Sequence, residues 1–136
     1  MNIDRLRSRL EEALQGRDDV ELALLFGSRA RGEAASGSDV DVAVVGRVVD
    51  TIGLAIELSD TVGLAVDVVD LSDDPPIALL LAVLRDGVKI REGRPGAHGR
   101  FLSHALMMLE TDLPGYRRMQ RAFLERVAER GLAGGR

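Results

Sequence analysis

Cysteine and tryptophan are absent from this chain of 136 residues, and only 3% of its residues are aromatic. Without cysteine the chain has neither disulfides nor thiolate metal ligands, a composition that fits a reducing compartment, so we expect a cytoplasmic protein. The scarcity of aromatic residues leaves few surfaces on which nucleic-acid bases could stack. We therefore expect no direct binding of nucleic acid.

Long apolar segments are also missing. The longest run, PIALLLAVL, ends at Arg85 and is far too short to cross a bilayer. The N-terminal stretch, MNIDRLRSRLEEAL, alternates charged and aliphatic residues and lacks the apolar core of a signal peptide. We therefore expect neither a membrane span nor a signal peptide, and the length fits a single domain.

The charges are distributed unevenly around a net charge of −4. Residues 1–84 carry 7 basic and 16 acidic side chains, whereas residues 85–136 carry 11 basic and 6 acidic ones. The acidic first part argues against a nucleic-acid-binding body. The basic second part suits an acidic partner or a phosphate, and it is equally compatible with the solvated faces of amphipathic helices.

Hydrophobic patterning predicts a small α/β (α+β-like) fold in which helices and strands alternate around one sheet. Short aliphatic runs indicate strands, while helical spacing, acidic caps, early prolines and closing glycines indicate helices. These patterns predict strands over residues 20–26, 39–45 and 64–70, and helices over residues 3–15, 48–62 and 75–86.

A helical extension is expected to follow this core. Residues 1–92 would form the core, with VKIRE (88–92) as a short edge strand, and residues 93–136 would form the extension. The extension reads either as two helices or as one helix broken at Pro114, because proline removes a backbone donor and crowds the preceding turn.

The stretch GSRARGEAASGSDVDVAVV, residues 27–45, carries the main chemical signal. Side chains alternate faces along a strand, so Asp39 and Asp41 would point to one side while the intervening valines point to the other. Two carboxylates on one face can hold a hard divalent cation, and Mg²⁺ favours a few carboxylates completed by water and substrate phosphates. Without a cation these two anions would repel each other.

Groups suited to binding phosphate precede the two aspartates. Gly27 would let a phosphate approach the backbone, and Ser28 at a helix start would offer its hydroxyl together with free N–H groups. Arg29 and Arg31 add positive charge in the same turn, and Ser38 immediately before the first aspartate is assigned to the same nucleotide-binding group. The structural alternative is a capped turn followed by a strand with two exposed acids.

A third carboxylate is available on the strand at VDVVD. Asp67 and Asp70 would face opposite sides of that strand, so only one can join the Asp-x-Asp pair. Asp67 lies between valines, where an unpaired charge would be costly, whereas Asp70 at the strand end is an ordinary solvated acid or cap. We therefore favour Asp67.

The glycine–serine pair, ten further residues and DVD resemble the signature of the polymerase-beta-like nucleotidyltransferase superfamily, and GSRARG…SDVDVAVV is similar to its minimal nucleotidyltransferase (MNT) branch. The resemblance covers roughly residues 20–92. It implies a mixed sheet flanked by helices, two Mg²⁺ ions and ATP as substrate. It also implies that Asp39 and Asp41 bind metal, that Asp67 is the third ligand and helps remove a proton, and that Gly27 with Ser28 holds the triphosphate.

The resemblance identifies the donor chemistry and leaves the acceptor open. Relatives that modify antibiotics or extend RNA carry large acceptor domains, whereas MNT proteins of this size resemble antitoxins paired with a HEPN-type ribonuclease toxin. We therefore expect transfer of AMP to a tyrosine of such a toxin. The alternatives are an antitoxin that neutralises its partner by binding alone, and transfer to a small aminoglycoside-type molecule.

The extension supplies the expected docking residues. Arg117, Arg118 and Arg121 follow Pro114 and would face an acidic surface of the toxin. The nearest arginines before the two histidines, Arg94 before His98 and Arg100 before His104, are separated from them by only three residues, too few for the Arg-x(4–6)-His motif of the toxin itself. His98 and His104 are therefore expected to be surface or packing residues.

Overall fold

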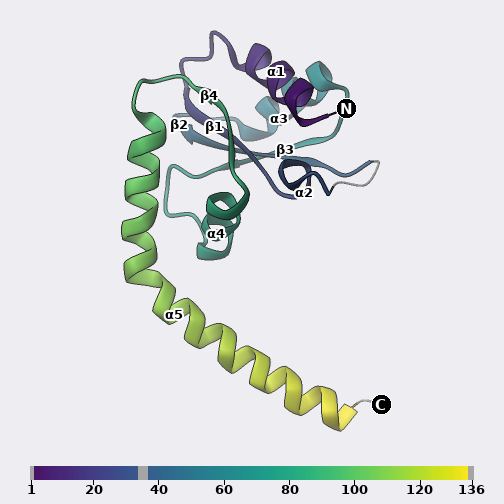
Figure 1. The fold of residues 1–136 in the computed structure, drawn as a ribbon, viewed down its shortest axis with the longest axis vertical. Coiled ribbons are helices and arrows are strands. Elements are labelled where there is room, and N and C mark those ends of the chain that lie inside the picture. The colour runs from purple at the N-terminus through teal and green to yellow at the C-terminus, as the bar shows by residue number, and fades with distance from the viewer. Residues whose placement is uncertain (1, 34–36, 135–136) are drawn as a thin grey trace. The chain divides into compact units, whose positions relative to one another are not determined.

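The computed structural model describes residues 2–33 and 37–134, and side chains up to residue 129. Strands and helices alternate through most of the chain (Figure 1). In chain order the elements are α1 (Ile3–Leu14), β1 (Val20–Phe26), α2 (Ser28–Arg31), β2 (Val40–Gly46), α3 (Thr51–Val62), β3 (Val66–Asp70), α4 (Ile77–Asp86), β4 (Val88–Glu92) and α5 (Ala97–Gly134).

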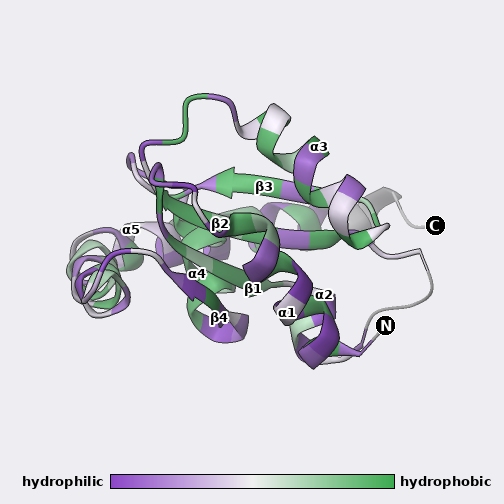
Figure 2. Cartoon of the chain, turned by 90° about the horizontal axis from the view of Figure 1, so that it is seen from above, coloured by the Kyte–Doolittle hydropathy of each residue, from purple (hydrophilic) through white to green (hydrophobic). Residues whose placement is uncertain are grey.

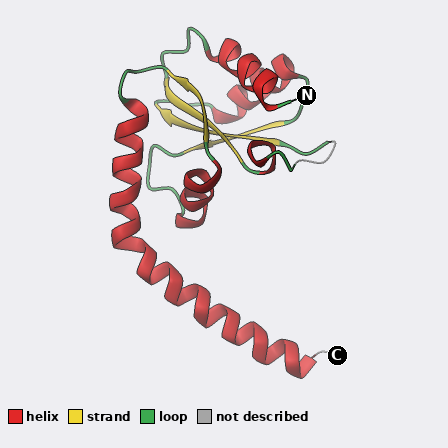
Figure 3. Ribbon diagram, viewed as in Figure 1, coloured by secondary structure: helices red, strands yellow, loops and turns green. Residues whose placement is uncertain are grey.

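The four described strands form one mixed sheet in the order β3-β2-β1-β4 (Figure 3). β1 pairs antiparallel with both β2 and β4, whereas β2 and β3 run parallel. The parallel pair needs a crossover, which α3 provides. The predicted fold class, a small mixed sheet flanked by helices, is confirmed.

Helices α1 and α3 lie on one side of the sheet and α4 lies on the other (Figure 1). α1 buries one stripe of leucines, including Leu6 and Leu10, which recur at helical spacing. Most residues of β1 and β2 are buried, and Figure 2 shows these strands as mostly hydrophobic. Apolar residues suit both strands because helices cover both sides of the sheet. On the second side α4 contributes Leu80 and Val83, both buried. The carboxylates therefore arise from strands that are held rigidly by packing.

Several elements differ from the sequence prediction at their ends. β2 begins at Val40, so Asp39 lies immediately before the strand. α3 begins at Thr51 instead of residue 48, because the carboxylate of Asp50 accepts from the N–H of Gly53 and caps the helix there. α2 is a single extra turn of helix after β1, which hydrophobic periodicity could not indicate in four residues.

The C-terminal extension forms a single helix and not two. The predicted break at Pro114 is absent, because the helix continues through this residue. A proline inside a helix removes one hydrogen bond and usually bends the axis, and Figure 1 shows α5 bending along its length. The chain divides into two compact units, residues 1–102 and 103–136, so that the first turn of α5 belongs to the first unit. None of the helices within the described residues is long and apolar enough to cross a membrane.

Candidate active site

The carboxylates of Asp41 and Asp67 lie on neighbouring strands at the same level of the sheet. In the parallel pairing of β2 and β3, Asp41 is the direct partner of Asp67. Both project from the face opposite to the valines that pack under α1 and α3. Asp39, two residues before Asp41, is exposed next to this pair. The structure therefore brings together the three aspartates that the sequence predicted.

These carboxylates influence one another electrostatically. Burial raises the pKa of the Asp41 carboxyl above its ordinary value, and the negative charges of Asp67 and Asp39 raise it further. Asp41 is half-buried, whereas Asp39 and Asp67 are exposed. A half-buried acid facing two like charges is an unfavourable arrangement for the protein alone. A bound divalent cation would reverse the sign of that interaction.

Gly27 occupies the position directly beside Asp41. Its backbone has φ 78° and ψ −161°, a conformation open essentially to glycine alone. A Cβ built at this residue would collide with Oδ2 of Asp41. The main chain at the end of β1 is therefore held against the carboxylate of Asp41.

Arg29 fixes the approach to the Asp-x-Asp segment. Its guanidinium donates to the carbonyl oxygen of Ser38 through Nε at 3.2 Å and Nη2 at 2.8 Å. Ser38 immediately precedes Asp39, so this fork ties α2 to the start of β2. Ser28 is the first residue of α2 and is half-buried. These contacts fix the position of the glycine–serine turn relative to the aspartates.

Arg31 is engaged with acidic side chains of the protein. Its guanidinium contacts Glu33 at 3.0 Å and Asp86 at 2.6 Å, and Asp86 also accepts from Arg85 at 2.9 Å. The side chain of Asp86 is only 3% exposed, so this pair fastens α2 to the end of α4. In this structure the guanidinium groups of Arg29 and Arg31 both hold the loop.

Asp70 is used elsewhere. It is opposite Val44 in the strand pairing, three residues further along than Asp67, and its carboxylate accepts from the N–H of Ser72 at 2.8 Å. This local hydrogen bond is the ordinary one made by an aspartate at a turn. The geometry thus separates Asp70 from the facing pair Asp41 and Asp67.

The donor set suits a hard cation that takes few ligands from the protein. Within residues 2–33 and 37–134, no three acidic or histidine side chains converge closely enough to enclose a metal ion by themselves. Magnesium is commonly bound by one or two carboxylates and completed by water and substrate phosphates. Asp41 and Asp67 at the open end of the sheet fit that requirement, and Asp39 lies beside them.

A family model described as polymerase beta, nucleotidyltransferase matches residues 8–94, a range that contains the whole arrangement just described. The chain belongs to this nucleotidyltransferase family. The superfamily that the glycine–serine and Asp-x-Asp spacing predicted is thereby confirmed. No curated protein matches the chain.

Solved structures resemble this nucleotidyltransferase over most of its length. A chain of a toxin–antitoxin complex with AMP-PNP has 24% identity and a TM-score of 0.69, covering 90% of this chain and 98% of that one. A chain from the complex of a tri-AMPylated Shewanella oneidensis HEPN toxin with an MNT antitoxin has 22% identity and a TM-score of 0.65, covering 92% and 98%. A protein assigned as a minimal nucleotidyltransferase has 32% identity and a TM-score of 0.52, covering 65% and 95%.

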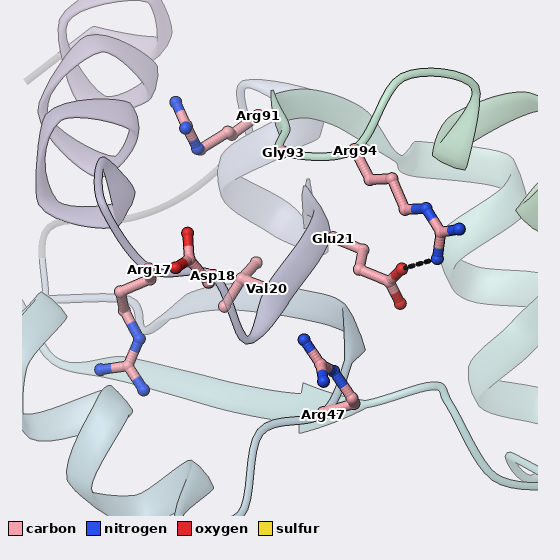
Figure 4. A pocket seen from close by; sticks show the side chains of 8 residues that line it. All are labelled: Arg17, Asp18, Val20, Glu21, Arg47, Arg91, Gly93 and Arg94. Atoms are coloured by element: carbon pink, nitrogen blue, oxygen red, sulfur yellow. Dashed lines mark hydrogen bonds and ion pairs between the residues drawn. The ribbon is translucent and has the colours of Figure 1, made fainter.

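A cavity of about 540 Å³ lies at the opposite end of the sheet in this nucleotidyltransferase, beside the start of β1. Figure 4 shows the side chains that line it. Arginines dominate its lining, and Arg94 pairs with Glu21 at 2.9 Å. None of the predicted site residues lines it. We assign the active site to the position of the three aspartates and not to this cavity, because the volume of a cavity does not show that it binds a substrate.

The predicted docking arginines lie on α5, in the second unit. Arg117, Arg118 and Arg121 are exposed and help to line a cavity of about 490 Å³ beside Pro114. His104 is exposed, while the backbone N–H of His98 donates to the carboxylate of Glu92 at 2.9 Å, so this interaction is structural.

Sequence reasoning missed the role of Asp86. It lies 55 residues from Arg31, so no local spacing indicates their contact. The weak signal available was the acid itself, placed at the C-terminal end of a helix, where a negative charge is unfavourable without a cationic partner.

Proposed function

We propose that this nucleotidyltransferase transfers AMP from ATP to a tyrosine of a HEPN-type toxin in the cytoplasm and so acts as its antitoxin. The observation that carries the proposal is the facing pair Asp41 and Asp67 with the backbone of Gly27 held against Asp41. A capped turn with two exposed acids would need neither the half-buried carboxylate nor the restricted glycine.

Two Mg²⁺ ions would activate the attacking hydroxyl and stabilise the pyrophosphate leaving group. Asp39 and Asp41 would bind these ions, and Asp67 would complete the set. Gly27 and Ser28 would direct N–H groups and a hydroxyl at the triphosphate. Arg29 and Arg31, proposed from the sequence as nucleotide-binding residues with Ser38, would act chiefly by holding this turn in place.

The acceptor hydroxyl would form a new bond to the α-phosphorus of ATP as the bond to pyrophosphate breaks. Asp67 would take the hydroxyl proton at a carboxylate oxygen, because it is exposed at the outer strand and open to an incoming group. Asp41 is half-buried and would hold metal instead.

The partner is proposed from the fold comparison and from the surface of α5. A similar chain comes from a complex of an MNT antitoxin with a HEPN toxin, and the toxin in that complex is tri-AMPylated. Exposed apolar side chains, including Met119 and Phe123, accompany the three arginines on α5. A helix that exposes apolar and basic groups together is suited to an acidic partner with an apolar centre.

The test is to incubate the protein with its cognate HEPN partner, ATP and Mg²⁺, and to measure the intact mass of the partner. Addition of one or more AMP units to a tyrosine supports the proposal. Toxin that is silenced without a change in mass would instead identify an antitoxin that acts by binding alone.

A further inference from the structure

A groove runs along the outer edge of β3, next to the third carboxylate. β3 is an edge strand of the described sheet, and the groove, about 240 Å³, lies between this edge and α3. Apolar side chains form most of its lining. The lining residues are Thr51, Ile52, Ala55, Ile56, Ser59, Val66, Asp67 and Val68.

Two isoleucines of α3 are left uncovered beside this groove. Ile52 is 74% exposed and Ile56 is 58% exposed, although both belong to a helix whose other side is fully packed. Asp67 is the single charged residue of the lining. An apolar groove next to one carboxylate is suited to an apolar occupant that approaches that carboxylate.

The backbone of β3 has N–H and carbonyl groups on its outer edge that could form hydrogen bonds with another strand. The N–H of Val40 donates to the carbonyl of Ala65 and the N–H of Leu71 donates to the carbonyl of Val44, both at 2.8 Å. Odd-numbered residues of β3 therefore direct their backbone groups toward β2, and Val66 and Val68 direct theirs outward. The N–H of Val66 is bound by Oγ of Ser59 at 2.9 Å, which leaves its carbonyl and both groups of Val68 facing the open edge.

Side-chain alternation links this edge to the chemistry. Asp67 projects on the face of the catalytic carboxylates, whereas Val66 and Val68 project on the face covered by α3. A strand added along the edge would alternate in the same way. A residue that faces Asp67 would thus have both of its neighbours on the side of Ile52 and Ile56.

We propose that the acceptor segment of the partner protein binds as an extended strand along the outer edge of β3. Its hydroxyl residue faces Asp67, and the apolar side chains on either side of that residue fill the groove against Ile52 and Ile56. The inference rests on the proposed function and specifies its substrate as an apolar–hydroxyl–apolar segment. Main-chain pairing supplies affinity in such binding, and alternate side chains supply selectivity.

The matched variants are Ile52→Asp, Ile56→Asp and Val49→Asp. Val49 is 98% exposed and does not line the groove, so it controls for adding an acid to the exposed surface near α3. All three positions are exposed, and we expect all three variants to fold. Transfer of AMP to the partner should fall in kcat/KM by about tenfold or more for Ile52→Asp and Ile56→Asp, because a charge replaces an apolar contact. ATP affinity should stay unchanged, and Val49→Asp should behave like the wild type.

Hydrogen exchange of the Val68 amide gives a readout that does not depend on turnover. In the complex with the partner this amide should be protected, while the amide of Val69, which faces β2, serves as the internal reference. If the wild type transfers AMP but Ile52→Asp and Ile56→Asp do so equally well, the groove is not the acceptor site and the proposed function stands. If no AMP is transferred yet the Val68 amide is protected, the strand pairing stands and the proposed function fails. Val68 unprotected in the complex overturns the strand pairing.

Discussion

Gly27 lies so close to Asp41 that any side chain at position 27 would occupy the space of the Asp41 carboxylate. The residue also has a backbone conformation that other residues adopt only with strain. The end of β1 and the start of β2 are therefore matched to each other at this one contact, and the proposed active site is built around it.

Gly27→Ala should abolish AMP transfer and lower the stability by about 1–3 kcal/mol, because it adds backbone strain and displaces Asp41. Gly63→Ala is the matched control, since Gly63 also has a positive φ, 74°, but nothing within 4 Å of the position of its Cβ. The control should lose stability and keep transfer. Thermal melts and transfer rates of both variants test this expectation. Full activity in Gly27→Ala would show that the close contact between Gly27 and Asp41 is not needed for transfer.

Asp41→Asn should abolish transfer while keeping or raising stability in metal-free buffer, because it removes a carboxylate that faces two like charges. The folded pKa of Asp41 is raised, so the folded state holds this proton more tightly than the unfolded state. The contribution to stability is present at low pH and is lost as the pH rises above about 4, the ordinary carboxyl range. Melts of the wild type and variant across this range, with and without Mg²⁺, measure the difference. A lower melting temperature for Asp41→Asn in metal-free buffer would contradict it.

Asp67→Asn should reduce transfer severely, and Asp70→Asn should reduce it mildly. Asp67 faces Asp41 across the strand pair, whereas Asp70 accepts a local hydrogen bond from Ser72. The two substitutions are chemically identical and lie three residues apart on one strand. The measurement is the transfer rate at saturating ATP. If Asp70→Asn lowers that rate more than Asp67→Asn does, the assignment of Asp67 as the third carboxylate is wrong.

Replacing Arg117, Arg118 and Arg121 with glutamate should slow transfer to the partner without changing ATP affinity. These arginines are exposed on α5, so the substitutions act on association and the effect should diminish as salt is added. The measurements are the association rate at several salt concentrations and ATP binding by calorimetry.

A second triple variant, with glutamate at Arg5, Arg47 and Arg126, controls for the change in net charge. These arginines are also exposed, and none of them lines the cavity beside Pro114. Equal slowing in both triple variants would show a general charge effect and would remove the docking role of the first set.

Much of the fold follows from local patterns in the sequence. The bounds of β1 agree with its aliphatic run. The alternation of aspartate and valine in DVDVAVV correctly places Asp41 on the face opposite to Val40, Val42 and Val44, which lie in the core. The argument that Asp67 and Asp70 face opposite sides also needs only the two-residue period of a strand.

The remaining features depend on contacts between distant residues. The sequence supplied Arg29 and Arg31 as candidates to bind phosphate, and the structure shows their guanidinium groups holding Ser38 and Asp86. Pro114 predicted a break, but α5 continues through it because the helix loses a single hydrogen bond. The exposure of Ile52 could not be foreseen, since periodicity indicates which side of a helix is apolar and not whether a neighbour covers it.

The most direct test of the account is the intact mass of the cognate HEPN partner after incubation with ATP, Mg²⁺ and either the wild type or Asp41→Asn. We predict that the wild type adds AMP to a tyrosine of the partner and silences its ribonuclease activity, and that Asp41→Asn does neither. A partner that is silenced equally by both proteins and shows no added mass would contradict the adenylyl transfer and leave an antitoxin that acts by binding.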